Sequence, residues 1–156
     1  MNHESLIRRT LELARQARAA GNHPFGALLV DATGKIIAEA QNTVGTERDC
    51  TGHAETNLMR LASKQCDRDF LASCTLYTST EPCIMCAGAI YWGNVKRLVF
   101  GLRESELLKL TGANPENPTL SLPVAEVYKL GKIAIEVIGP ILEAEARVVH
   151  KGFWEI

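Results

Sequence analysis

Two cysteines, a histidine and a glutamate are the residues of this sequence whose types and spacing could do chemistry. Cys83 and Cys86 follow Pro82 in the run PCIMC, and His53 and Glu55 stand two apart in the run HAE. Residues three apart lie on one face of a helix, so both sulfurs can point at the same atom. Such a cysteine pair is compatible with a disulfide, a redox pair, a metal site or an ordinary buried helix.

The redox pair and the structural metal site both require features that the sequence lacks. A redox pair of the Trp-Cys-Gly-Pro-Cys type has its proline between the cysteines, whereas this proline precedes the first one. A structural zinc site needs four protein ligands, but there is no second Cys-x-x-Cys pair and no closely spaced histidine pair. The cysteine total of five is odd, and the charged, amphipathic start predicts a helix rather than a signal peptide. We therefore expect reduced thiols in a cytoplasmic protein.

His53 adds a third ligand to the two thiolates, and this set predicts a catalytic zinc site. Three protein ligands leave the fourth tetrahedral position to water. Glu55 is spaced to take a proton from that water and pass it on without binding the metal. Helix N-termini expected at residues 53 and 83 would direct positive dipole ends at the site and help to keep the thiolates anionic.

Alternating helices and strands must position these residues. Apolar residues recur at helical spacing in the first twenty positions, and Pro82 suits the first turn of a helix. The alternation predicts one domain, residues 1–156, with a three-layer α/β/α fold around a mixed five-stranded sheet. We expect helices at 4–20, 53–66, 83–92, 104–110, 124–130 and 140–154, a hairpin at 25–42 that turns at 31–34, a loop at 43–52, and strands at 74–80, 96–102 and 134–139.

Composition and charge exclude two classes of partner. The apolar runs are too short to span a bilayer, so no membrane association is expected. The 17 basic and 18 acidic residues give a net charge of −1. Proteins that bind nucleic acid usually carry a basic excess, so a nucleic-acid partner is not expected.

The His-x-Glu and Pro-Cys-x-x-Cys pattern resembles that of the zinc-dependent cytidine-deaminase-like superfamily. The similarity continues through PFGALLV, LYTSTEPCIMCAGAIYW and RLVFG to the closing helix. The resemblance implies a zinc ion held by His53, Cys83 and Cys86, with Glu55 as the proton shuttle. It also implies that the reaction is hydrolytic removal of an amino group as ammonia.

Among the branches of this superfamily, the N-terminal half is most similar to bacterial guanine deaminases. In that branch the asparagine matching Asn42 binds the purine, the segment matching Tyr91 and Trp92 lines the pocket, and Phe25 would belong to the apolar wall. The branch also carries an aspartate pair after the fourth strand. In the corresponding loop, TGANPENPT, the candidate carboxylate is Glu116. The resemblance therefore implies a small nucleobase as the substrate, guanine first.

Several alternatives stay open from the sequence. The closing segment is about as similar to tRNA adenosine deaminases as to guanine deaminases, and a cytosine or nucleoside deaminase is a third possibility. A non-enzymatic zinc protein would not need Glu55 beside an open metal position. The guanine branch exchanges C-terminal segments in a dimer, which implies a homodimer here. Phe153 and Trp154 would then either close a pocket or pack as core.

Overall fold

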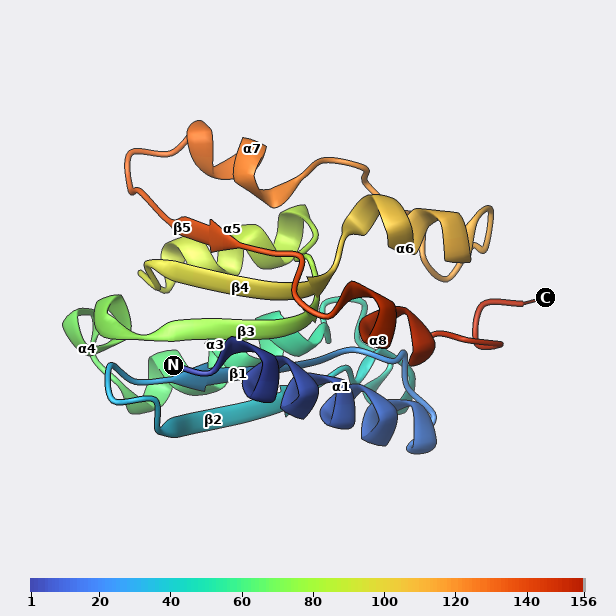
Figure 1. Ribbon diagram of the computed structural model, residues 1–156, viewed down its shortest axis with the longest axis horizontal. Helices are drawn as coiled ribbons and strands as arrows, with labels where there is room; N and C mark the ends of the chain where they lie inside the picture. Colours follow the sequence, from blue (N-terminus) through green and yellow to red (C-terminus); the bar gives the residue numbers. More distant parts are fainter. Residues whose placement is uncertain (156) are drawn as a thin grey trace.

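The computed structural model describes residues 1–155 and arranges them in three layers around one mixed sheet (Figure 1). In spatial order the strands are β2 (Ile36–Gln41), β1 (Gly26–Val30), β3 (Thr75–Thr80), β4 (Arg97–Leu102) and β5 (Glu136–Ile138). β1 is antiparallel to both β2 and β3, whereas β3, β4 and β5 are parallel. The expected α/β fold with a mixed five-stranded sheet is confirmed.

Helices cover both faces of the sheet, and the central strands β1 and β3 contribute apolar side chains to both sides. β1 and β3 are buried along their whole length, as expected for strands covered by helices on both faces. Leu28, Val30 and Tyr77 pack in one apolar cluster, and Leu29 and Leu76 pack in the other. The first cluster lies under α1 (His3–Ala19), α6 (Glu104–Thr111) and α8 (Glu143–Val148), and the second under α3 (Ala54–Gln65), α5 (Ile84–Trp92) and α7 (Val124–Lys129).

Two short helices were not expected, and the last helix is shorter than expected. α2 (Val44–Glu47) lies in the expected loop, and α4 (Arg68–Ser73) begins where the Asp67 side chain accepts a hydrogen bond from the backbone N–H of Phe70. Elements this short do not complete an apolar repeat that a sequence pattern could reveal. α8 covers 143–148 rather than 140–154, and the residues after it form turns that include Gly152 at a positive φ of 72°.

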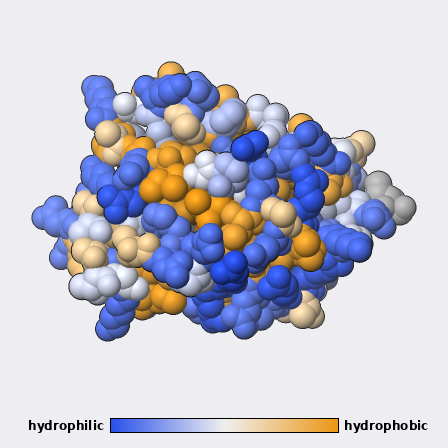
Figure 2. Space-filling model, in the orientation of Figure 1, coloured by the Kyte–Doolittle hydropathy of each residue, from blue (hydrophilic) through white to orange (hydrophobic). Residues whose placement is uncertain are grey.

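The face of the molecule in Figure 2 is mostly hydrophilic, with apolar side chains gathered along β5 and the segment that leads into α8. Across residues 1–155, none of the helices has both the length and the apolar character needed to cross a membrane.

Gly26 lets α1 pack directly on β1. A Cβ atom at this position would lie 2.5 Å from the Leu13 Cβ and the Thr10 carbonyl oxygen, and 2.8 Å from the Ala14 nitrogen. Two of these atoms are backbone, so the helix would have to move.

We therefore expect Gly26→Ala to lower the free energy of unfolding by about 1–3 kcal/mol, as overpacking does in well-packed cores. Chemical denaturation followed by circular dichroism measures this change. Gly88→Ala is the matched control, because a Cβ there meets nothing within 4 Å and Gly88 lies inside α5. An equally stable Gly26→Ala protein would contradict the close approach of α1.

Candidate active site

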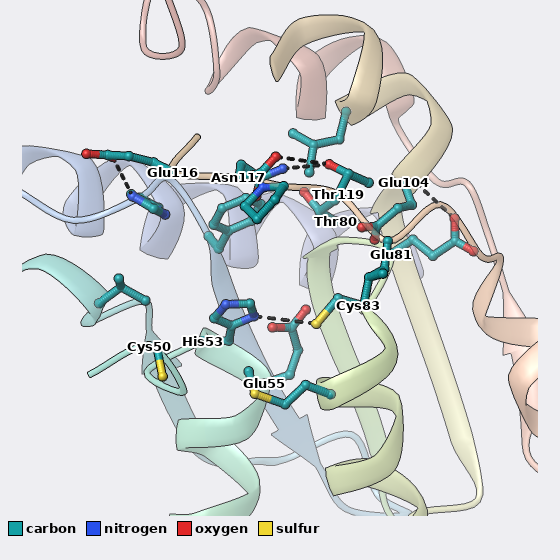
Figure 3. Close-up of a pocket in the computed structure, with 17 residues that line it drawn as sticks. Cys50, His53, Glu55, Thr80, Glu81, Cys83, Glu104, Glu116, Asn117 and Thr119 are labelled. Atoms are coloured by element: carbon teal, nitrogen blue, oxygen red, sulfur yellow. Dashed lines mark hydrogen bonds and ion pairs between the residues drawn. The ribbon is translucent and has the colours of Figure 1, made fainter. Parts of the chain in front are cut away.

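The three predicted zinc ligands meet where α3 and α5 begin. His53 is the N-cap residue of α3, Cys83 is the N-cap residue of α5, and Cys86 lies one turn further on. The Nδ1 atom of His53 lies 3.5 Å from the sulfur of Cys83 and 3.5 Å from that of Cys86, and the three possible ligand atoms all lie within 4.8 Å of one another. Figure 3 shows the contact between His53 and Cys83. The structure therefore brings together one nitrogen and two sulfurs from two helix N-termini, as the spacing predicted.

The electrostatics of this cluster suit a divalent cation. Hydrogen bonds with Cys86 and His53 lower the pKa of Cys83 to about 4. The hydrogen bond to Cys83 and burial raise the pKa of Cys86. One of the two thiols therefore ionises easily, whereas the negative charge of the first thiolate opposes ionisation of the second. A cation between the two sulfurs would remove this repulsion. One histidine and two thiolates form the donor set of a zinc site with an open fourth position.

Glu55 lies beside this cluster with its carboxyl group between His53 and Cys83 (Figure 3). The residue is only 5% exposed, and burial raises the pKa of its carboxyl group. The buried hydroxyl of Thr78, on β3, donates a hydrogen bond of 2.8 Å to Glu55 Oε1. A carboxyl group held in one orientation next to a metal position can accept a proton there and release it again.

A cavity of about 360 Å³ opens above the cluster. His53, Glu55 and Cys83 form part of its wall, and α6 and the loop at 113–120 contribute further polar groups. Carboxyl groups are prominent in this lining, from Glu55, Glu81, Glu104 and Glu116. The cavity therefore offers hydrogen-bond acceptors to a ligand, and none of the described residues that line it is a lysine or arginine that would attract a phosphate.

The structure brings Phe25 and Glu116 to the cavity. Phe25 lies in the wall, in line with its predicted place. Glu116 is at the rim, where its side chain is 68% exposed and its Oε2 lies 3.0 Å from His23 Nε2. This contact joins the loop at 113–120 to the segment before β1.

Asn42 and Trp92 are not among the residues that line the cavity. The Asn42 side-chain oxygen accepts hydrogen bonds from the backbone N–H groups of His23 and Val44, so it holds these turns in place. Trp92 ends α5 and is 77% exposed. The nine residues of α5 span about 13 Å, which separates Trp92 from Cys83 at the other end.

Phe153 and Trp154 support the cavity from behind rather than lining it. The Trp154 ring centroid lies 5.1 Å from that of His23 and 6.1 Å from that of Phe25, both of which are wall residues. Its indole N–H donates to His150 Nδ1 at 3.1 Å. In the single chain the buried Trp154 side chain therefore packs behind the cavity wall, and the partly buried Phe153 ring packs edge-on against it.

Two buried glutamates of the site did not stand out in the sequence. Glu81 accepts hydrogen bonds from the backbone N–H groups of Glu104 and Val124, so it fixes the starts of α6 and α7. Glu104 is 6% exposed, and burial together with Cys83 and Glu55 raises its pKa to about 8. The position of Glu81 before Pro82 was an available signal, whereas Glu104 follows an ordinary strand and has no motif around it.

Comparisons with known proteins point to the same chemistry. A probable cytosine deaminase from Schizosaccharomyces pombe is 44% identical over 149 residues, which cover 96% of this chain and 90% of the relative. A guanine deaminase from Bacillus subtilis is 45% identical over 107 residues, covering 68% of each chain. A solved structure of a guanine deaminase from Nitrosomonas europaea matches with a TM-score of 0.78 and 30% identity, over 96% of this chain and 83% of that one. Relatives also include tRNA-specific adenosine deaminases.

The family model for the cytidine and deoxycytidylate deaminase zinc-binding region matches residues 1–102. This span contains His53, Glu55, Cys83 and Cys86. The family and the donor set agree on zinc as the cofactor. The chain therefore belongs to the cytidine and deoxycytidylate deaminase family of zinc-binding hydrolytic enzymes.

Proposed function

We propose that this enzyme deaminates a free nucleobase, with His53, Cys83 and Cys86 as its zinc ligands and Glu55 as its proton shuttle. One observation carries the proposal: the buried carboxyl group of Glu55 lies beside the three possible ligands at the bottom of a cavity. A structural metal site has no need of a buried acid beside an open position, whereas hydrolysis needs a group that moves protons.

The residues of the chain divide the work of the reaction. Zinc, when bound, supplies a Lewis acid that lowers the pKa of its water to about 7. Glu55 accepts a proton from the attacking water and delivers it to the ring nitrogen beside the amino-bearing carbon. It then carries a proton to the departing amine. A carbon–oxygen bond forms, the carbon–nitrogen bond breaks, and ammonia leaves.

The size and charge of the cavity favour a small base over an RNA. Ligand pockets range from about 300 to 1,000 Å³, so this one lies near the lower end. An anticodon arm would have to be held through its phosphates. Within residues 1–155, no lysine or arginine lines the cavity, and the net charge of the chain is −1. Neither feature favours the binding of a polyanion.

Cytosine and guanine are the two bases that the relatives suggest. We place cytosine ahead of guanine, because the similarity to the S. pombe relative runs over 149 residues and so includes α6 and the loop at 113–120. Guanine, the base implied first by the resemblance, keeps the support of the N. europaea structure, which matches over 96% of the chain. Both bases carry an amino group on a carbon next to a ring nitrogen, so the proton transfers proposed for Glu55 apply to either.

Ammonia release from the zinc-loaded protein tests this proposal. The substrates are cytosine, guanine, adenine, cytidine and a tRNA anticodon arm in one buffer, compared by kcat/KM. We expect cytosine or guanine to exceed the others. Preference for the tRNA arm would refute the free-base assignment and leave the deaminase chemistry in place. No ammonia from any of the five would refute the proposed function.

Thr78 is expected to set the orientation of the Glu55 carboxyl group. Its hydroxyl is buried and donates at 2.8 Å to Glu55 Oε1. Thr78→Val keeps the shape of the side chain and removes this donor. We expect kcat to fall by about 10-fold, because a buried hydrogen bond lost to one partner costs about 1–3 kcal/mol, while KM and zinc content stay close to wild type.

Thr78→Ser is the matched control, because it keeps the hydroxyl and loses only a methyl group. We expect it to restore most of kcat. A purely structural role predicts the opposite order, with the serine variant no more active than the valine variant. Steady-state kinetics with elemental analysis of zinc distinguishes these results.

A further inference from the structure

Glu104 places a carboxyl group in the cavity that nothing else in the chain uses. Within residues 1–155, no hydrogen bond or ion pair reaches its carboxyl oxygens, and its backbone N–H is the group that donates, to Glu81 Oε1. Glu81 makes the contrast clear, since each of its two carboxyl oxygens accepts a backbone N–H. Glu104 is also 6% exposed and lines the cavity with His53 and Cys83.

Thr80 is a second polar group without a partner in the same wall. Its side-chain oxygen is buried and makes no hydrogen bond within the described residues. Thr80 pairs with Leu102 across the parallel strands β3 and β4, and Glu104 follows Leu102 by two residues. Both side chains therefore emerge at the same edge of the sheet, and Figure 3 shows the Glu104 carboxyl group turned toward Thr80.

Buried polar groups that have no hydrogen-bond partner in the protein indicate that a ligand supplies one. Burying a carboxyl or hydroxyl group without a hydrogen-bond partner is costly, and native structures rarely leave such groups unsatisfied. Here both groups line the cavity in which a substrate would meet Glu55. A ligand with an N–H donor and a neighbouring acceptor would satisfy both.

We propose that Glu104 is a substrate-binding residue that accepts a hydrogen bond from a ring N–H of the nucleobase, with the Thr80 hydroxyl donating to the carbonyl beside that N–H. The proposal rests on the proposed function. An N–H next to a carbonyl is an edge that cytosine and guanine share, whereas adenine has no carbonyl. Glu116, the carboxylate implied by the resemblance, also lines the cavity, and it pairs with His23 at the rim.

Binding measured without turnover tests this subsite. Zinc-loaded Glu55→Gln protein serves as the background, and isothermal titration calorimetry gives Kd for cytosine and for guanine. We expect Glu104→Ala to raise Kd by about 10-fold or more, because the ring N–H of the bound base would be left buried without an acceptor, and Thr80→Val to raise it by less. Glu126→Ala is the control, because Glu126 is exposed in the first turn of α7 and lies outside the cavity.

A methylated base identifies the atom that Glu104 contacts. The N1-methyl derivative of the base that binds lacks the ring N–H. It should bind more weakly than the parent base when Glu104 is present, and the difference should largely disappear in Glu104→Ala, as coupled partners require. An equal penalty in both proteins would overturn the contact.

The outcomes distinguish a failure of the proposed binding role of Glu104 from a failure of the proposed deaminase function. If Glu104→Ala binds the base as tightly as its background, with unchanged zinc content and melting temperature, the subsite is wrong even though the wild type deaminates. A lower melting temperature with unchanged Kd would show a structural role and overturn it equally. If the wild type deaminates no base, the proposed function fails and the subsite fails with it.

Discussion

Glu55→Gln is expected to lower kcat by about 10²–10⁴-fold, the usual contribution of a general acid–base group, while zinc content and fold stay unchanged. The amide has nearly the size of the carboxyl group but cannot take up and release the proton. Glu55 is buried and hydrogen-bonded by Thr78, so water from bulk solvent cannot easily replace it. It is also no member of the His53, Cys83 and Cys86 ligand group, so zinc should stay bound.

Three measurements on the same preparation check this prediction. Ammonia release gives kcat, elemental analysis gives zinc per chain, and thermal unfolding reports the fold. Glu47→Gln is the control, since Glu47 is an exposed residue of α2 and is not part of the cavity lining. A near-normal kcat in Glu55→Gln would rule out the proton-shuttle role, and loss of zinc would place Glu55 among the metal ligands.

The sequence predicted the group of three metal-ligating residues because most of its geometry is local to two short segments. Cys83 and Cys86 lie one turn apart on α5, and Pro82 precedes the helix that they begin. His53 is the N-cap residue of α3, as Cys83 is the N-cap residue of α5. The remaining requirement, that the two helix starts face one another, follows from a fold that the alternation of elements already predicted. For a motif of this kind, the local helix geometry therefore determines most of the positions of the ligand residues.

The substrate wall was harder to predict because it depends on contacts between distant segments. Glu104 reaches the cavity through the pairing of β3 with β4, and Thr80 faces it from the neighbouring strand. Neither position has a local pattern that marks it. Trp92, which the resemblance places in a pocket, ends α5 with its side chain exposed in the single chain.

The homodimer and the pocket roles of Asn42 and Trp92 stay predictions. The homodimer follows from the resemblance, and the two pocket roles follow from the guanine deaminase branch. Asn42 is buried beside the segment that carries His23, a wall residue, so its substitution would alter the cavity even without a direct contact to the base.

Cys83→Ala and Cys86→Ala are each expected to lose zinc and, with it, all measurable deamination. Zinc that is held by three protein ligands keeps one open position, and two ligands cannot hold it in that geometry. Cys86 is the more buried of the two cysteines, so its alanine variant also loses core packing under α3 and α5. Elemental analysis of purified protein, without added chelator, should give close to one zinc ion per wild-type chain and almost none in either variant.

Cys50→Ala and Cys74→Ala are the matched controls for this experiment. Cys50 lines the same cavity, yet it lies outside the group of ligand atoms. Cys74 is buried in the core beneath α3, away from the site. Both variants should keep their zinc and their activity, because metal binding depends on the ligands that meet at one point and not on the number of thiols. Full zinc retention in Cys83→Ala or Cys86→Ala would contradict the assignment, whatever the loss of activity, because the residue would then act on the base and not on the metal.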